Sequence, residues 1–271
     1  TTEIYTLSLH DALPIWVRPK ISVITISFNS YNTIEKTIKS VIGQTYPDIE
    51  FILVDGGSTD GTVDILNRYR DRIDILRIEP DMGIYDAMNK GISLSSGDWI
   101  CFMNSNDHFY NDTVIEDVFS GGTDGDIIYG YCIDPDTGKS VKPLSLDLFW
   151  KRIPINHQSA FVKAAYHRER PYELKYTVSS IYDFLYYWYK RGLIFRYVDI
   201  PVAVYDMKGL SFYSFAWLWD YVRISMKYSK GKKIRVIFRF IYLFFVRIYI
   251  NLFLRRKRSE ERRVGKECRS R

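Results

Sequence analysis

The sequence predicts an α/β protein in which a Rossmann-like, mixed but mostly parallel sheet is flanked by helices. Three observations predict this fold class. Short apolar, β-branched runs alternate with amphipathic segments, the connecting loops are short, and polar residues follow several of the runs. Such alternation is typical of parallel strands joined by right-handed helical crossovers. The aromatic content of 16% leaves ample material for a hydrophobic core.

The first predicted strand, Ile21–Ser27, is a continuous apolar and β-branched run, as expected for a strand buried on both faces. After the polar loop Phe28–Asn32 we expect a helix, because its apolar residues recur at helical spacing. They are Ile34, Ile38, Val41 and Ile42. Glu50–Asp55 is the second predicted strand, and the turn Gly56–Thr62 is rich in residues that begin helices.

The same alternation continues to about residue 104. We predict a helix through Val63, Leu66 and Tyr69, and the remaining elements follow in order. They are a strand over Ile73–Glu79, a helix over Asp86–Ser95 and a strand over Asp98–Asn104. In parallel sheets ligands bind beyond the carboxyl ends of the strands. The sequence therefore predicts a site built from three polar clusters that follow strands: Ser27–Asn29, Asp55–Gly57 and Asn104–Asp107.

The charge is unevenly distributed along the chain. Twelve Lys and Arg residues and no acidic residue lie between positions 221 and 258, while the body over 17–220 is acidic, at about −6. This distribution argues against nucleic-acid binding and favours an enzyme bound at a surface. The segments 1–16 and 259–271 resemble translated adapter sequence, and we expect them to be a non-native lead-in and a non-native tail. Cys101 and Cys132 lack metal-binding spacing, so a cytoplasmic compartment is expected.

No Gly-x-Gly-x-x-Gly motif and no complete Gly-x-x-x-x-Gly-Lys-Ser/Thr P-loop is present, so a nucleotide would be held by side chains and a divalent metal. Four segments carry a specific resemblance: ISVITISFN, QTYPDIEFILVDGGSTDGT, EPDMGIYDAMNKGI and GDWICFMNSNDHF. In order and spacing, Ile21–Phe109 resembles the nucleotide-sugar half of family 2 glycosyltransferases, which have the GT-A fold. It is most similar to the branch that builds bacterial exopolysaccharide and lipid-linked repeat units.

The resemblance implies a GT-A domain over 17–220, with a nucleotide-sugar half (17–110) and an acceptor half (111–220). It implies transfer of a sugar from a nucleotide-sugar donor, which we expect to be a UDP-sugar, onto a polysaccharide or lipid-linked saccharide acceptor, with inversion. A catalytically weak nucleotide-sugar-binding membrane protein is the alternative. A nucleotidyltransferase is disfavoured, because the loop after the first strand is not glycine-rich.

Residue by residue, the resemblance places Ser27 and Asn29 in the nucleoside pocket and Asp55 against the base. A turn-forming Asp is the alternative for Asp55, and we interpret Asp60 as a helix cap. Further along, it places Gly83, Asp86 and Asn89 beside the donor. Met88 stands where the family often has Arg, and Lys90 is our candidate for the missing charge. Plain helix packing through Ala87, Met88 and Ile92 is the alternative.

The family's Asp-x-Asp motif is replaced here by Asn104-Ser105-Asn106, and Asp107 follows one residue later. We predict that Asn104 and Asn106 contact the nucleotide sugar and that Asp107 binds Mg²⁺ or Mn²⁺, since carboxylates suit hard cations better than amides. A metal-independent site is the alternative.

In the acceptor half, His157 resembles a family histidine that faces the active site, and a hydrogen-bonded core histidine is the alternative. The family's Glu-Asp pair, which supplies the general base, is Ser180-Ile181 here. Asp183 is our candidate for the base. Two residues along a helix rotate a side chain by about 200°, however, so a changed register, another base or an impaired enzyme stays open.

The segment 221–258 is predicted to be a helical tail at the membrane interface. Within it Arg239 and Arg247 interrupt the apolar residues, so no apolar run reaches the roughly 20 residues that span a bilayer. Lys232, Arg235, Arg239 and Arg247 fall within an arc of about 120° on a helical wheel. We predict that this basic face of an amphipathic helix meets anionic head groups at the inner face of the cell membrane. A buried or partner-facing helix and a tilted spanning helix are the alternatives.

Overall fold

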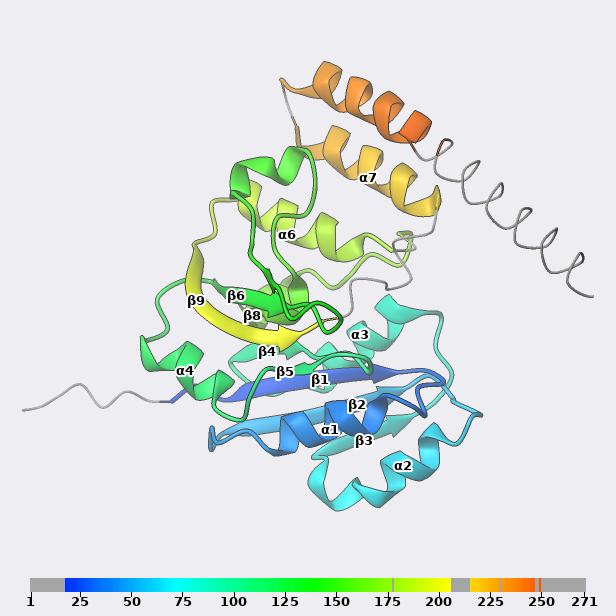
Figure 1. The fold of residues 1–271 in the computed structure, drawn as a ribbon, viewed down its shortest axis with the longest axis vertical. Helices are drawn as coiled ribbons and strands as arrows, with labels where there is room; N and C mark the ends of the chain where they lie inside the picture. The colour runs from blue at the N-terminus through cyan, green and yellow to red at the C-terminus, as the bar shows by residue number, and fades with distance from the viewer. Residues whose placement is uncertain (1–17, 177, 206–214, 230, 247–248, 250–271) are drawn as a thin grey trace, which may run out of the picture.

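The computed structural model describes residues 18–176, 178–205, 215–229, 231–246 and 249. The predicted lead-in (1–16) and tail (259–271) lie outside these residues. Within them the chain forms one mixed sheet, in which β3 (Ile75–Ile78), β2 (Ile49–Asp55), β1 (Ile21–Ser27) and β4 (Trp99–Phe102) run parallel. The four predicted strands and their parallel arrangement are confirmed (Figure 1).

The sheet continues beyond β4 in the order β8, β6, β9 and β5, with β7 paired to β6. The pairs β4–β8, β8–β6 and β9–β5 are antiparallel, while β6 and β9 are parallel. The bounds of these strands are β5 His108–Phe109, β6 Ile127–Ile133, β7 Ser140–Val141, β8 Ala160–Lys163 and β9 Phe195–Val204. The predicted fold class, a mostly parallel α/β sheet with flanking helices, is therefore confirmed.

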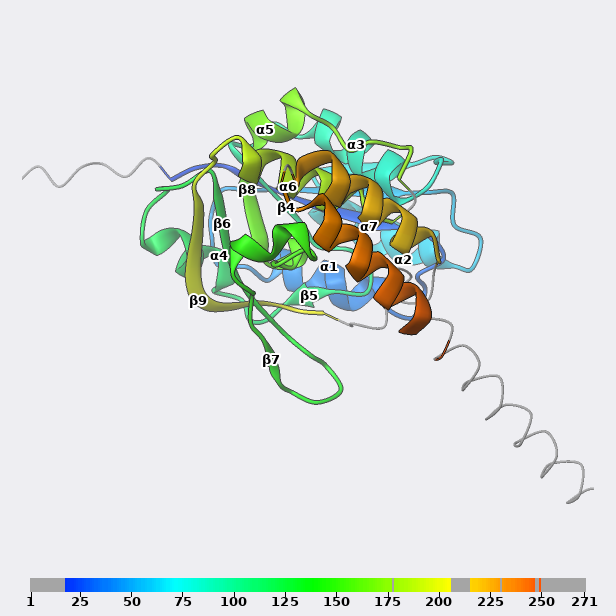
Figure 2. The same cartoon turned by 90° about the horizontal axis from the view of Figure 1, so that it is seen from above.

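Helices cover both faces of this sheet. Their bounds are α1 Ile34–Ile42, α2 Thr62–Arg68, α3 Ile84–Leu94, α4 Val114–Ser120, α5 Ala164–Glu169, α6 Ser180–Lys190 and α7 Phe215–Tyr228. Short 3₁₀ helices lie at η1 Arg70–Arg72, η2 Leu146–Trp150 and η3 His157–Ser159. Seen from above, α3, α5 and α6 lie on one side of the strands and α1 on the other (Figure 2).

The alternation of side chains along β1 explains this layering, because successive residues of a strand point to opposite faces. Ile21 and Val23 pack with α1, α2 and α4, whereas Ile24 and Ile26 pack with α3 and α6. Each face thus has its own hydrophobic core. α3 approaches β1 closely at Gly91, where a Cβ atom would lie 2.5 Å from Cγ2 of Ile24.

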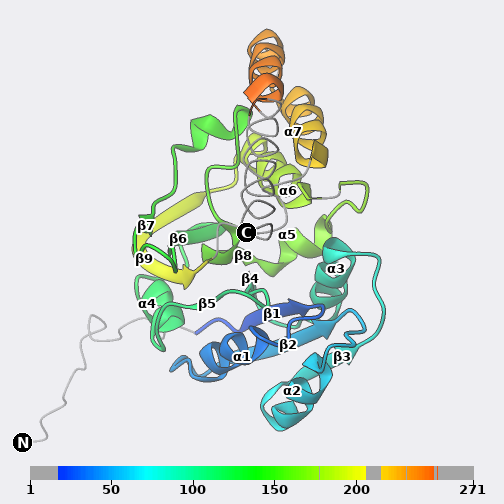
Figure 3. The same ribbon diagram turned by 45° about the vertical axis from the view of Figure 1, so that its right-hand side comes forward.

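The C-terminal part of the described chain is a pair of helices, α7 and residues 233–246. They form one end of the molecule, and α2 lies at the opposite end (Figure 3). α7 crosses the predicted boundary at residue 220, and its residues Tyr221 and Ile224 are buried. α7 therefore belongs to the hydrophobic core that also contains α3 and α6. Within the described residues, no helix combines the length and apolar character that crossing a membrane requires.

The residues of the predicted basic face are divided on the 233–246 helix, because Arg235 is exposed whereas Arg239 lies against the body. Val236 is fully buried against the body, and on the same flank Arg239 Nε donates to the carbonyl oxygen of Lys151 (3.4 Å). The ammonium group of Lys232 lies 5.8 Å from the centre of the Trp150 ring. These basic side chains lie along the body because their aliphatic stems cover aromatic surface. The outward face is apolar: Ile234, Phe238, Ile241 and Phe245. Arg247 lies outside the described residues.

Candidate functional site

The three predicted polar clusters lie at the same edge of the sheet. β1 is central, with Ser27 paired to Asp55 on β2 and with β4 on its other side. Beyond β4 the N–H of Ser105 donates to the carbonyl of Ile26 at 3.2 Å, so the Asn104–Asp107 loop follows β1 to its end. In Figure 1 these ends lie to the right, where β1 points. The convergence expected from the parallel topology is present.

Asn29 joins the loops that follow β1 and β2. It has a positive φ of 48°, which Asn tolerates better than most residues. Its N–H donates to Ser58 Oγ (2.7 Å), and its Oδ1 accepts from the N–H of Thr59 (2.9 Å). Asn29 therefore holds the shape of the edge on which a nucleoside would lie.

Asp55 forms a turn at the end of β2, which is the alternative that the sequence left open. The side chain is fully buried, and its carboxylate accepts from the N–H groups of Gly57 (3.1 Å) and Ser58 (2.8 Å) and from Ser58 Oγ (2.7 Å). The N-cap of α2 is Gly61, so the predicted cap role of Asp60 is wrong by one position; Asp60 instead accepts from the backbone N–H and hydroxyl of Thr62, the first residue of the helix. Asp55 thus shapes the loop from within.

Around Asn29 and Asp55 the edge offers two features that suit a ligand. Ser27 Oγ is buried and has no hydrogen-bond partner among the described atoms, although buried hydroxyls are usually paired. Large apolar side chains on the loops after β1 and β3 are exposed: Phe28 (62%), Tyr31 (52%) and Met82 (81%). Sequence reasoning missed this apolar rim, because single apolar residues in loops give no periodic signal.

The start of α3 is held by local contacts. Gly83 directly precedes the helix and has a backbone φ of +111°, which residues other than glycine rarely adopt. Asp86 accepts from the N–H of Met82 (3.0 Å). Lys90 Nζ donates to the carbonyl of Pro80 (2.8 Å) and lies 3.2 Å from Glu79 and 3.4 Å from Asp86. These contacts fix the loop that the resemblance places along the donor.

Asn89 faces the acceptor half. Its amide nitrogen donates to the carbonyl of Tyr172 and its oxygen accepts from the N–H of Tyr172, both at 2.8 Å. Both ends of the side chain are thus used to hold α3 against the segment after α5. The neighbouring Ala87, Met88 and Ile92 are buried, so packing accounts for this face of α3, as the alternative interpretation stated.

The Asn104–Asp107 loop meets the His-Gln pair. The amide nitrogen of Asn104 lies 3.3 Å from Nε2 of His157, and Asp107 accepts from the amide of Gln158 (3.2 Å). Asp107 is only 4% exposed, whereas Asn106 is exposed. Oδ1 of Asn104 is buried with no hydrogen-bond partner in the described structure. The loop therefore carries the Asp107 carboxylate and, three residues earlier, an Asn104 amide oxygen that has no hydrogen-bond partner among the described residues.

His157 is neutral at physiological pH. Burial lowers its pKa to about 4, because the imidazolium is disfavoured away from water. A neutral ring with an unprotonated Nε2 accepts from the Asn104 amide, which turns the Asn104 oxygen away from the histidine. His157 therefore orients Asn104. His157 thus lies next to the Asn104–Asp107 loop.

Asp183 is separated from solvent by basic and phenolic groups. It is 0% exposed and ion-paired with Arg170 and with Lys227 (3.1 Å). Tyr228 Oη also donates to its carboxylate (3.0 Å). The network joins α6 to α7 and to the segment after α5. Sequence reasoning could not find these partners, because they lie 13 to 45 residues away.

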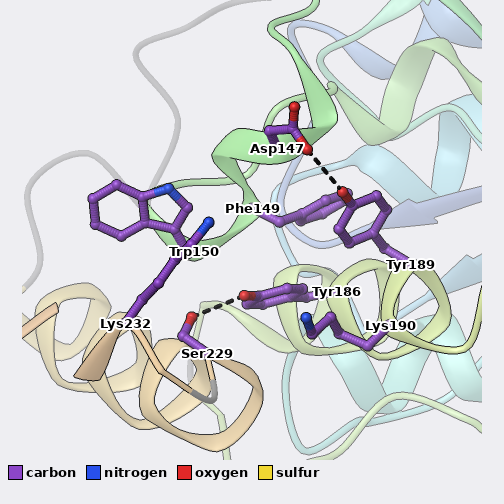
Figure 4. A pocket seen from close by; sticks show the side chains of 8 residues that line it. All are labelled: Asp147, Phe149, Trp150, Tyr186, Tyr189, Lys190, Ser229 and Lys232. Carbon is purple, nitrogen blue, oxygen red and sulfur yellow. Dashed lines mark hydrogen bonds between the residues drawn. The ribbon is translucent and has the colours of Figure 1, made fainter. Parts of the chain in front are cut away.

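A hollow of about 80 Å³ lies apart from the strand ends, between η2, α6 and the start of the C-terminal helix (Figure 4). Its lining includes Phe149, Trp150 and Tyr186, with Lys190 and Lys232 at its margin. Pockets for small-molecule ligands are typically about 300–1,000 Å³. This hollow is therefore too small for a nucleotide sugar, and the strand edge is the better candidate for the donor site.

The sheet order and a polar edge at the carboxyl ends of β1, β2 and β4 define a GT-A-type fold with a nucleotide-binding edge. The "Glycosyl transferase family 2" model matches residues 22–218, most of the chain. The chain belongs to glycosyl transferase family 2 and is a glycosyltransferase.

Individual relatives agree with this assignment. A "PGL/p-HBAD biosynthesis glycosyltransferase" of Mycobacterium bovis is 32% identical over 200 residues, which cover 70% of this chain and 78% of the relative. TuaG of Bacillus subtilis, whose name assigns it to teichuronic acid biosynthesis, is 40% identical over 98 residues, covering 35% of this chain and 39% of TuaG.

Two solved structures share the fold. TarS 1-349 of S. aureus in complex with UDP has a TM-score of 0.62 at 16% identity, with 80% of this chain and 68% of that chain covered. The mannosyltransferase PcManGT of Pyrobaculum calidifontis, in complex with GDP-Man and Mn²⁺, has a TM-score of 0.59 at 17% identity, with 80% and 65% covered. At these identities the likeness concerns the fold alone.

Proposed function

We propose that this glycosyltransferase moves a sugar from a UDP-sugar onto a lipid-linked or polysaccharide acceptor, with inversion at the anomeric carbon. The observation that carries the proposal is the convergence of the loops after β1, β2 and β4 at one edge, where the buried side-chain oxygens of Ser27 and Asn104 have no hydrogen-bond partner in the described part of the chain. Relatives named for teichuronic acid and PGL/p-HBAD biosynthesis support an acceptor of this class.

The donor half would bind the nucleotide through a preformed surface. Asn29 and Asp55 hold their loops by backbone contacts, so little ordering entropy is lost when a ligand binds. The unpaired Ser27 hydroxyl is available to the nucleoside, and Phe28 and Tyr31 offer apolar surface to its rings. Asp86 and Lys90 hold the α3 loop that would lie along the donor sugar.

The residues present fit a divalent cation of the Mg²⁺ or Mn²⁺ type. Asp107 supplies a carboxylate, and the buried Asn104 Oδ1 supplies an oxygen without another partner. Among the described residues there is no cluster of three or more His, Cys, Asp or Glu ligands for a metal. Mg²⁺ is often held by one or two carboxylates together with substrate phosphates, which matches this sparse set. When bound, such a cation offsets the charge of the leaving diphosphate.

Transfer requires a base that takes the proton of the acceptor hydroxyl while the nucleoside diphosphate leaves. The surroundings of Asp183 weigh against its predicted role as this base, because an acceptor hydroxyl cannot reach a carboxylate enclosed by Arg170 and Lys227. His157, neutral and half-buried, orients Asn104.

We also propose that the protein docks peripherally on the inner face of the cell membrane. The outward residues of the 233–246 helix are large, apolar and exposed, among them Ile234 (71%), Phe238 (68%) and Phe245 (64%). Exposed Lys233 and Arg235 lie on the same helix, where they would meet anionic lipids. Apolar residues then enter the head-group region while the basic residues stay at its rim. A lipid-linked acceptor is presented at such a surface.

The test is a transfer assay with the full chain, a panel of nucleotide sugars and an extract of lipid-linked saccharides. Release of nucleoside diphosphate and formation of a glycosylated lipid product are measured for wild type, Asp107→Ala and the control Asp71→Ala. Asp71 is exposed on η1, so its replacement should leave transfer unchanged. Equal turnover of wild type and Asp107→Ala would discard the metal role.

The second candidate is a catalytically weak nucleotide-sugar-binding membrane protein. It is favoured by the missing carboxylates at positions 180 and 181 and by Asn at positions 104 and 106. Calorimetry of UDP-sugar binding, together with the transfer assay, decides between the two functions. Binding of UDP-sugar with no product from any acceptor extract would support the second candidate and contradict the first.

A further inference from the structure

The loop after β1 is held along its backbone by side chains of the segment after β2. Three consecutive N–H groups of the first loop donate to side-chain oxygens of the second segment, which spans Gly56–Thr62. The pairs are Asn29 to Ser58 Oγ (2.7 Å), Ser30 to Thr62 Oγ1 (2.8 Å) and Tyr31 to Asp60 Oδ2 (3.1 Å). In return, Asn29 Oδ1 accepts from the N–H of Thr59 (2.9 Å). These hydrogen bonds join residues that lie 29 to 32 positions apart in the sequence.

Two of these accepting groups are hydroxyls that in turn donate to a carboxylate. Ser58 Oγ donates to Asp55 Oδ2 at 2.7 Å, and Thr62 Oγ1 donates to Asp60 Oδ1 at 2.5 Å. Such a hydroxyl is a better acceptor, because hydrogen bonds in a chain polarise one another. In P-loops a row of N–H groups cradles phosphate. Here side chains of the protein itself already satisfy the N–H groups of residues 29–31, so this backbone is not available to the diphosphate.

The same segment supports the exposed aromatic rings of the loop after β1. A Cβ atom on Gly56 would lie 3.3 Å from Cδ2 of Phe28, and one on Gly61 would lie 3.1 Å from Cδ2 of Tyr31. Each ring therefore rests against a glycine, while 62% of Phe28 and 52% of Tyr31 stay exposed. Aromatic side chains that are held in place and yet open to solvent suit the flat base of a nucleoside, since every base can stack on an aromatic ring.

We propose that Ser58, Asp60 and Thr62 are positioning residues for the donor. They fix the backbone of the loop after β1, and with it the two aromatic rings, before the nucleotide binds. The proposal rests on the proposed function, which assigns these rings to the nucleoside. A surface that is shaped in advance loses little conformational entropy on binding. The three side chains act through the loop, so their loss should weaken donor binding and leave the chemical step unchanged.

The test measures UDP binding by calorimetry, donor KM and kcat in the transfer assay, and stability by urea unfolding. Ser58→Ala removes the acceptor of the Asn29 N–H and the hydroxyl bond to Asp55. UDP affinity should fall and donor KM should rise, each about five- to tenfold, because a net hydrogen bond changes an equilibrium constant by roughly two- to tenfold. The kcat value should stay within about twofold of wild type, since binding lost equally from ground state and transition state changes KM alone.

Two further variants and a double-mutant cycle sharpen the test. Ser58→Thr keeps a hydroxyl and should restore UDP affinity. Ser120→Ala is the matched control, because Ser120 is an exposed serine on α4 whose hydroxyl donates to the carbonyl of Asp117 at 2.8 Å. In Figure 1, α4 lies on the side opposite to the one where β1 points. If Ser58 acts through the loop, the double variant with Phe28→Ala should lose less UDP affinity than the product of the two single losses.

Failure of this proposal differs from failure of the proposed function. If wild type and Ser58→Ala bind UDP equally well, Ser58 does not position the donor site and the proposed function stands. If Ser58→Ala loses kcat together with UDP affinity and unfolds at a lower urea concentration, Ser58 is a structural residue and the positioning role is wrong. Independent losses in the cycle would show that Ser58 does not act through the ring of Phe28. If wild type binds no UDP, the UDP donor and the positioning role both fall.

Discussion

In the donor half, buried carboxylates accept mainly from backbone N–H groups and hydroxyls of nearby loops, whereas in the acceptor half Asp183 accepts from two cations. Asp55 is held by residues two and three positions away. The partners of Asp183 lie on α7 and on the segment after α5. The contrast teaches that a buried acid shapes a ligand-binding loop in one half and holds helices together in the other. Changes in the two halves should therefore affect different properties.

The largest expected effect is on folding stability, at Asp183. Replacing it by Asn removes the buried counter-charge of Arg170 and Lys227 and leaves Arg170 only the more exposed Glu173 at 3.7 Å, and breaking a buried pair typically costs about 3–5 kcal/mol. Urea unfolding of Asp183→Asn should show this loss, while Asp64→Asn on the exposed side of α2 should change stability by less than about 0.5 kcal/mol. Equal stability of the two variants would contradict the structural role of Asp183.

Asp107 should show the opposite behaviour, a large loss of transfer with a smaller loss of stability. A catalytic cation contributes several kcal/mol, so Asp107→Ala should reduce turnover by about 100-fold or more. Thermal melting should show a modest shift, because Asp107 loses the hydrogen bond from Gln158. The comparison sharpens if added Mn²⁺ stimulates wild type and leaves the variant unchanged. If Asp107→Ala is instead unfolded, Asp107 has a structural role like that of Asp183.

Glu50 tests whether the donor half also contains a structural acid. Burial by itself raises its pKa, but hydrogen bonds from Ser22, Ser96 and Lys20 lower it to about 2. A carboxylate with a lowered folded pKa stabilises the fold above its unfolded value, and this contribution is lost as pH falls from about 4.5 through about 2.

The expected contribution of Glu50 is roughly 3 kcal/mol. Stability measured from pH 5 to pH 2 should fall less steeply for Glu50→Gln than for wild type. Parallel curves for the two proteins would show that Glu50 does not cause the loss of stability at low pH. Because Glu50 lies near the start of β2, away from the strand ends that form the donor edge, binding of UDP-sugar at neutral pH should be kept.

The smallest expected effect concerns the outward face of the 233–246 helix. Burying one Phe side chain is worth about 1.5–3 kcal/mol, so Phe238→Ser should weaken binding to vesicles of phosphatidylglycerol and phosphatidylcholine roughly tenfold or more. Phe28→Ser, at the donor edge, is the matched control and should bind vesicles as wild type does. Identical vesicle binding by wild type and Phe238→Ser would contradict membrane docking through this face.

Much of the fold was predictable because the signals are local. The apolar runs at Ile21–Ser27 and Glu50–Asp55 and the spacing of Ile34 and Ile38 identify strands and helix without reference to distant residues. From parallel topology alone it followed that the polar ends of these strands lie together. The turn role of Asp55 was also among the sequence interpretations.

The environment of the acceptor half was not predictable, because its charges are paired across long separations. Asp183 is 44 residues from Lys227, and no pattern in the sequence links them. The helical wheel gave a basic arc for 232–247, but it could not say which side faces the body. Burial of Val236 and the contact of Arg239 with Lys151 set the side that faces the body, which leaves Ile234, Phe238 and Arg235 exposed.

The sequence by itself determined the elements, their parallel order and the edge that carries the polar residues, since strand and helix periodicity are properties of neighbouring residues. Only the tertiary structure decided which acids are enclosed by cations and which residues of the C-terminal helix are exposed. These depend on the docking of α6, α7 and α3, whose contacts join residues far apart in the chain. Long-range packing sets burial, and burial sets what each charged group can do.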